Sequence, residues 1–225
     1  MTNHQSATSV AVPGVAFHPW VGTEYASSGL DGKKILILGE SFYGPLDPVD
    51  AANLPSFAEV VVRGYITRPA GLRLFRTVEK LFGRTPGADA AERLAFWNRV
   101  AFGNFIQDVL VDRTSEHRPT EQQWSAARPC FLDLLDALRP DAVLVLGEGV
   151  WMSLSTPHFL NSKPVASAMK SDGSEPFLYE WTMPAGYKVR ATWVNHPTGS
   201  FGFRLDKWAP RVQTLLEAAS ERSGE

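Results

Sequence analysis

Polar side chains that can take part in catalysis follow four separate apolar stretches of the chain. They are the carboxylate of Glu40, the hydroxyl of Ser41, the carboxamide of Asn104 and the imidazole of His196, with Glu148 after the remaining stretch. A carboxylate can stabilise a developing cation and orient a water molecule, while preorganised N–H donors can stabilise a developing anion. The set predicts one polar site built from distant parts of the chain.

The four apolar stretches are typical of buried strands. Residues 33–38 and 142–147 are continuous apolar strands, residues 100–105 form another, and residues 177–194 favour a hairpin whose second arm is the fourth. Consecutive apolar positions indicate burial on both faces, as in parallel sheets. Ligands of such sheets bind beyond the carboxyl ends of the strands, so the polar residues are expected to meet at that edge.

Apolar residues at helical spacing lie between the strands. Helices are expected over residues 72–82 and 89–97, from a Thr120–Gln123 capping box onward with a kink at Pro129, and over residues 208–219 with Pro210 in the first turn. The alternation predicts an α/β fold with three αβα layers and a four-stranded parallel sheet in the order 2-1-3-4, plus a small hairpin excursion.

The remaining segments set the domain organisation. Residues 1–31 are expected to form a partly ordered N-terminal arm, residues 32–225 a single α/β domain, and residues 157–175 an excursion over its surface. His18-Pro19-Trp20 is a candidate anchor for the arm.

Composition narrows the possible classes of protein. The net charge of −2 gives no global basic field, and Cys130, the only cysteine, is expected to be a buried apolar side chain. One cysteine excludes an intrachain disulfide, a cysteine-based zinc site and a chain-held iron–sulfur cluster. No leader or membrane-spanning pattern is present, so we expect a cytoplasmic monomer without metal or cofactor.

Three motifs in order resemble the uracil-DNA glycosylase superfamily. They are the loop G-E-S-F-Y-G that begins at Gly39, Asn104 at the end of the second strand, and H-P-T-G from His196. The resemblance spans roughly residues 33–204 and implies that the chain removes uracil or another deaminated base from DNA by hydrolysing its N-glycosidic bond. The base would be flipped into a cleft at the carboxyl edge of the sheet.

The resemblance also implies roles for the matching residues. Glu40 would serve the catalytic water, His196 would stabilise the departing base, Asn104 would read the uracil edge, and Tyr43 would close the pocket. Ser41 stands where the best-known branch has an aspartate, and Phe42 stands where a proline is usual. Ser41 cannot supply the carboxylate of that aspartate. We expect both Ser41 and Phe42 to contact the substrate.

Aromatic and basic residues are the candidates for nucleic-acid contacts. Phe42, Phe57 and Tyr65 could stack on the base. The resemblance implies that the loop after His196 enters the duplex, where its contacts are expected from Thr198, Phe201, Phe203 and Arg204. The cations between Arg63 and Lys80 are either phosphate contacts or a solvated helix face.

Each residue also has a structural interpretation. Glu40 and Glu148 could cap helices, Asn104 could be a turn residue, His196 a structural hydrogen-bonding residue and Tyr43 an edge-packing side chain. Phe201 and Phe203 could pack the last helix against the sheet.

Two other functions fit the same residues. A non-catalytic module could use the pocket to bind a nucleobase or nucleotide. A small esterase could use Ser41 as nucleophile, Asn104 in an oxyanion hole and His196 as base, although Trp193 stands where that family has an aspartate.

Overall fold

The computed structural model describes residues 10–43, 54–68, 73–87, 89–110, 118–154, 160–165, 177–198 and 203–220. Its strands are β1 (Trp20–Val21), β2 (Ile35–Gly39), β3 (Phe42–Tyr43), β4 (Val100–Asn104), β5 (Val109–Leu110), β6 (Ala142–Leu146), β7 (Ser162–Pro164), β8 (Leu178–Thr182) and β9 (Lys188–Val194). Its helices are η1 (Leu54–Ser56), α2 (Phe57–Thr67), α3 (Arg73–Leu81), α4 (Ala90–Trp97), α5 (Glu121–Leu138), α6 (Glu148–Leu154) and α7 (Leu205–Ser220).

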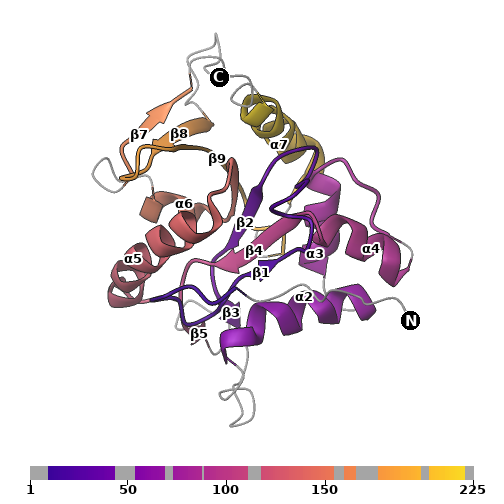
Figure 1. The fold of residues 1–225 in the computed structure, drawn as a ribbon, viewed down its shortest axis with the longest axis horizontal. Helices are drawn as coiled ribbons and strands as arrows, with labels where there is room; N and C mark the ends of the chain where they lie inside the picture. The colour runs from indigo at the N-terminus through magenta and orange to yellow at the C-terminus, as the bar shows by residue number, and fades with distance from the viewer. Residues whose placement is uncertain are drawn as a thin grey trace.

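A seven-stranded mixed sheet forms the centre of the α/β fold, in the order β1-β4-β2-β6-β9-β8-β7 (Figure 1). The four expected strands are the parallel core β4-β2-β6-β9, in the expected order. The prediction of a four-stranded parallel sheet is nevertheless wrong, because β1, β8 and β7 extend it with antiparallel pairs. A second small sheet joins β3 to β5 in parallel.

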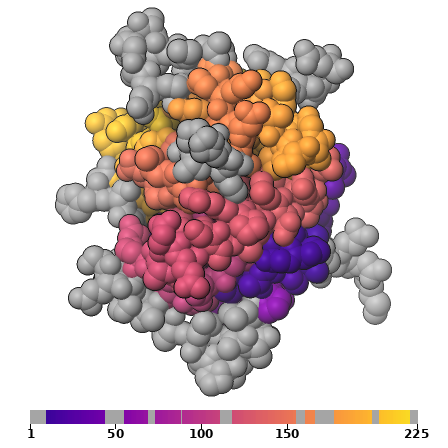
Figure 2. All heavy atoms as spheres, turned by 90° about the vertical axis from the view of Figure 1, so that its left-hand side faces the viewer, coloured from indigo at the N-terminus to yellow at the C-terminus, as the bar shows by residue number. Residues whose placement is uncertain are grey.

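Helices cover both faces of the sheet (Figure 1). Ile35 and Ile37 of β2 pack with α2, α3, α4 and α7, whereas Leu36 and Leu38 pack with α5 and α6. Side chains alternate across a strand, so a strand that is apolar at every position supplies two cores at once. Figure 2 shows the α5 face, with α5 beside the N-terminal segment and the paired strands β7 and β8.

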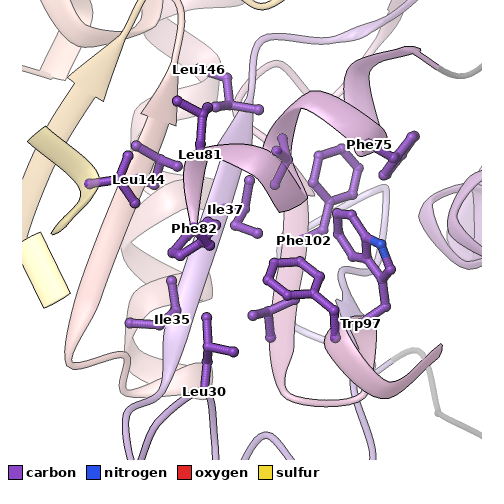
Figure 3. Packing of buried hydrophobic residues seen from close by; sticks show 14 of the residues in the cluster. Leu30, Ile35, Ile37, Phe75, Leu81, Phe82, Trp97, Phe102, Leu144 and Leu146 are labelled. Carbon is purple, nitrogen blue, oxygen red and sulfur yellow. The ribbon is translucent and has the colours of Figure 1, made fainter. Parts of the chain in front are cut away.

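The core under α3 and α4 is largely aromatic. Figure 3 shows Phe75 of α3, Trp97 of α4 and Phe102 of β4 grouped beside Ile37. The ring of Phe75 lies 5.0 Å from that of Trp97 and 5.3 Å from that of Phe102, in edge-on geometry. This packing fixes α3 against the sheet near the end of β4.

Most helix predictions are confirmed. Asp89 caps α4 by accepting from the Glu92 N–H at 2.9 Å, and both hydrogen bonds of the Thr120–Gln123 capping box begin α5. The last helix starts at Leu205, three residues before the expected start, so Pro210 lies inside it rather than in its first turn. The expected hairpin is β8 and β9.

Three other predictions need correction. The N-terminal arm is attached more extensively than by the single anchor expected at His18-Pro19-Trp20: β1 joins the sheet, and the Trp20 side chain is 1% exposed with its indole N–H donating to the Trp97 carbonyl at 2.8 Å. Cys130 is half-buried rather than buried: it lies within α5 and packs at the margin of the core. Of the surface excursion, residues 160–165 are described; they place Leu160 in the core and form β7.

Among the described residues, no helix is both long enough and apolar enough to cross a membrane.

Candidate active site

A pocket of about 380 Å³ lies at the carboxyl ends of β2, β4 and β9. Eight of the residues named as candidates from sequence line it: Glu40, Ser41, Phe42, Tyr43, Phe57, Asn104, His196 and Thr198. Its other lining residues are Gly39, Val61, Arg73, Leu74, Phe75 and Phe102. The structure thus brings a carboxylate, a carboxamide and an imidazole from three strand ends to one cavity.

The exits of β2 and β4 are hydrogen-bonded to each other. Gly39 pairs with Asn104 in the register, the Phe105 N–H donates to the Gly39 carbonyl at 2.9 Å, and the Ile106 N–H donates to the Glu40 carbonyl at 2.8 Å. A Cβ on Gly39 would lie 2.2 Å from Asn104 Oδ1, so only glycine leaves room for the carboxamide. The backbone itself therefore sets the spacing between Glu40 and Asn104.

Asn104 is buried and has unused hydrogen-bonding capacity. Its backbone carbonyl accepts from the Gln107 side chain at 2.7 Å, and Gln107 in turn accepts from the Phe17 N–H at 3.0 Å. The residue is 4% exposed, and within the described part of the chain its carboxamide makes no hydrogen bond. Because Asn104 lines the pocket, its amide donors and acceptor are available to a bound ligand. The interpretation of Asn104 as a turn residue explains the hydrogen bond to its backbone carbonyl, but it does not explain why its side-chain amide has no partner among the described residues.

Two donors converge on one oxygen of Glu40. The Tyr43 hydroxyl donates to Oε1, and Arg118 Nη1 donates to the same oxygen at 3.0 Å. The Glu40 side chain is 12% exposed and that of Arg118 59% exposed. Oε2 lies 3.3 Å from the position that a Cβ on Gly149 would occupy. Because β3 and not a helix follows β2, Glu40 is not the helix cap of the alternative interpretation.

Tyr43 acts as a donor in this group. Burial and the hydrogen bond to the negatively charged Glu40 raise the pKa of Tyr43 to about 12. The phenol therefore keeps its proton at neutral pH and holds the carboxylate.

His196 is oriented by the residue two positions later. The Thr198 N–H donates to His196 Nδ1 at 3.3 Å, and the Thr198 hydroxyl lies 3.3 Å from the same nitrogen. With Nδ1 as acceptor, the neutral ring carries its proton on Nε2 and can donate it to a ligand. Thr198 therefore lies in the pocket as a support for His196.

An aromatic wall closes one side of the pocket. The Phe42 ring meets that of Phe57 at 4.7 Å and that of Phe17 at 5.4 Å, both edge-on. Phe42 and Phe57 line the pocket, as expected for candidate stacking residues. Tyr65, the third candidate, is fully buried against Phe75 in the core and does not line the pocket, so it cannot stack on a base there.

Ser41 is bonded to the backbone rather than poised for attack. Its hydroxyl lies 2.8 Å from the Asp108 carbonyl and 3.0 Å from the Phe42 carbonyl, and these are its hydrogen-bond acceptors among the described residues. An activated serine nucleophile needs a base as acceptor. This geometry disfavours the esterase.

The predicted nucleic-acid loop is only partly described. Phe201 lies outside the described residues. Phe203 packs against the core beside α7, as its structural interpretation expected, and exposed Arg204 is paired with Asp206. In this structure, therefore, both Phe203 and Arg204 make contacts within the protein.

Two cations at this site were not predicted to lie at the pocket. Arg73 lines the pocket from the start of α3, and its place among the closely spaced cations of residues 63–80 was the available signal. Arg118 lies 78 positions from Glu40, and no local pattern indicates their pairing.

No protein-family model matches the chain, and a search of curated proteins finds no match. Among the described residues, no group of three or more His, Cys, Asp or Glu side chains could hold a metal ion. Conclusions about function therefore depend on the pocket itself.

Proposed function

We propose that this chain hydrolyses the N-glycosidic bond of uracil, or of another deaminated base, in DNA. The observation that carries the proposal is the buried carboxamide of Asn104, which has no partner among the described residues and shares the pocket with Glu40 and His196. An amide offers an acceptor and two donors side by side, which matches the alternating edge of a pyrimidine dione. The pocket's 380 Å³ falls within the range of small-molecule sites.

The proposed reaction uses water alone as co-substrate. The bond between sugar and base breaks with its electrons passing to the base, so the sugar becomes cationic and the base anionic. Glu40 stabilises the cation and orients the water, and the Nε2 proton of His196 stabilises the anion. Water then supplies hydroxide to the sugar and a proton to the base.

The remaining walls suit a flat ring. Phe42 and Phe57 offer aromatic surface for a base removed from its stack, and Tyr43 stands beside Glu40 at the same cavity. A base in a duplex must be flipped out to enter such a pocket, so single strands should be the easier substrates.

One observation favours a second candidate, a module that binds a nucleobase without turnover. Arg118 and Tyr43 both donate to the Glu40 oxygen Oε1, which reduces the negative charge that this oxygen offers to a sugar cation. The two functions share the Asn104 pocket and differ in whether the bond is cut.

An excision assay tests the proposal. The protein is incubated with labelled single- and double-stranded oligonucleotides containing uracil, hypoxanthine or xanthine, and abasic sites are revealed by alkaline cleavage. We expect cleavage of at least one of these strands and a fall in kcat/KM of about 10- to 100-fold in Asn104→Ala, which removes a buried base-reading group. Ser41→Ala, the matched change in the same pocket, should alter it less than about threefold.

The same assay separates the alternatives. Base binding without cleavage of any strand would support the binding module. Hydrolysis of p-nitrophenyl acetate that is abolished in Ser41→Ala would identify the esterase and overturn the proposal.

A further inference from the structure

Helix α3 carries three cations on one exposed face. Arg73, Arg76 and Lys80 stand at positions i, i+3 and i+7, and all three are exposed. Residues at this spacing share a helix face. The opposite face, which includes Phe75, Val78 and Leu81, is buried in the core. We call the three cations the α3 basic face.

These cations differ from most arginines on the surface. Arg63, Arg84, Arg99 and Arg204 each pair with a carboxylate, at nitrogen–oxygen distances between 2.5 and 3.1 Å. Within the part of the chain that the structure describes, Arg73, Arg76 and Lys80 form no ion pair. A merely solvated helix face gains from alternating charges, whereas three like charges without counter-ions repel one another.

The α3 basic face begins at the pocket. Arg73 is part of the pocket lining, together with Leu74 and Phe75 of the same helix. From Arg73 to Lys80 the helix advances seven residues, or about 10 Å at 1.5 Å per residue. A single phosphate can contact the cations at only one end of this row. The successive phosphates of a nucleic-acid strand can contact all three cations, from Arg73 at the pocket to Lys80.

We propose that the α3 basic face binds the phosphate backbone of a nucleic-acid strand and positions one nucleotide of that strand over the pocket. The identity of the strand as substrate rests on the proposed function, but the preference for a chain of phosphates rests on the charges alone. The net charge of −2 makes such a local surface necessary, because the protein as a whole offers a polyanion no attraction. Arg73 contacts the phosphate nearest the flipped base, and Arg76 and Lys80 contact those beyond it.

Salt-dependent binding tests the assignment. Affinity of the full chain for a fluorescent single-stranded oligonucleotide without damage is measured by anisotropy over a range of salt concentrations. The variant Arg76→Gln/Lys80→Gln leaves the pocket intact and should reduce the slope of log affinity against log salt by about 0.7 for each cation removed. The matched control Arg84→Gln/Arg99→Gln removes two exposed but paired arginines and should leave the slope unchanged. Equal slopes in both variants would overturn the proposal.

Two further arms identify the ligand and keep the two proposals apart. Binding of uracil as the free base should not change in Arg76→Gln/Lys80→Gln, because the base carries no phosphate. Polyglutamate binding with the same dependence on Arg76 and Lys80 would show a general polyanion surface and overturn the assignment to nucleic acid. If strand binding depends on Arg76 and Lys80 but no base is excised, the proposal for the α3 basic face is supported and the glycosylase proposal is rejected. If excision occurs and does not change when Arg76 and Lys80 are replaced, the glycosylase proposal is supported and the proposal for the α3 basic face is rejected.

Discussion

Two carboxylates of the same residue type lie in contrasting regions of this protein. Glu40, at the exit of β2, receives hydrogen bonds from Tyr43 and from the guanidinium of Arg118. Glu79 of α3 is 1% exposed in the core and accepts from the indole N–H of Trp97 at 2.8 Å. Burial raises the pKa of the Glu79 carboxyl above its ordinary value of 4.5.

The difference shows what makes a buried carboxylate useful. Glu79 links α3 to α4 through the indole of Trp97 and does not line the Asn104 pocket. Glu40 has an exposed cation as partner and opens onto a cavity. Burial alone therefore does not single out a candidate catalytic carboxylate, whereas a place at the carboxyl end of a strand and at a cavity favours Glu40 as the candidate.

The sharpest test of this comparison makes the same substitution at both sites. If the proposed function holds, Glu40→Gln should lower excision by about 10²- to 10⁴-fold, because it removes the charge that stabilises the sugar cation. Glu79→Gln should leave excision per folded molecule unchanged. The measurement is kcat/KM on a single-stranded uracil oligonucleotide, and equal losses in both variants would erase the distinction.

A smaller effect is expected from Gly149→Ala, which crowds Glu40 without changing it. The new Cβ would lie 3.3 Å from Glu40 Oε2 and 3.7 Å from the Trp124 ring, so the carboxylate must move by a few tenths of an ångström. We expect excision to fall by about threefold to tenfold, since misplacement by 1 Å costs about 100-fold.

The matched control is Gly64→Ala in α2, where an added Cβ meets nothing within 4 Å. That variant should keep its activity and gain about 0.5–1 kcal/mol of stability from improved helix propensity. An active Gly149→Ala with unchanged kcat/KM would show that Glu40 needs no exact placement.

A still smaller loss is expected from Arg118→Ala. The ion pair with Glu40 is largely solvent-exposed on the arginine side, and such pairs contribute about 1 kcal/mol or less. Excision should change by no more than about fivefold, with Arg118→Lys closer to the parent. If Arg118→Ala were instead more active, the arginine would be restraining Glu40, as the binding module requires.

The smallest effect lies in the pH dependence of stability. Because the native pKa of Glu79 is raised above 4.5, the native state holds this proton more tightly than the unfolded chain does. This contribution is complete below pH 4.5 and is lost as the pH rises through the raised pKa. Glu79→Gln cannot titrate, so its urea midpoint relative to the parent should rise with pH across this window. A constant difference between pH 4 and 8 would contradict the assignment.

The sequence predicted the parts of the fold that depend on long patterns. Ile35–Gly39 and Ala142–Leu146 are apolar at every position, which requires burial on both faces, and the parallel order follows from helices between them. The prediction that Glu40, Asn104 and His196 meet needed only the rule that parallel strands end at one edge.

Short or mixed elements escaped prediction. Strands β1 and β3 have two residues each, too few to show a period, and α2 combines three consecutive valines with Gly64, which weakens its helical pattern. Arg118 was missed because it reaches Glu40 only through the tertiary fold. The sequence left open whether Phe203 is a wedge or a packing residue, because no local pattern tells the two apart, and the structure shows it packed against the core.

The hydrogen bonds between the exits of β2 and β4 have a consequence for ligand binding. The N–H groups of Phe105 and Ile106 donate to the carbonyls of Gly39 and Glu40, in the backbone next to Asn104 and Glu40. Their hydrogens should exchange slowly with solvent, because Phe105 and Ile106 are 1% and 0% exposed although both bonds lie just beyond the strand ends. The backbone that carries Glu40 and Asn104 is then already ordered before a ligand binds. Little conformational entropy is left to lose there, and more of the interaction energy remains as affinity.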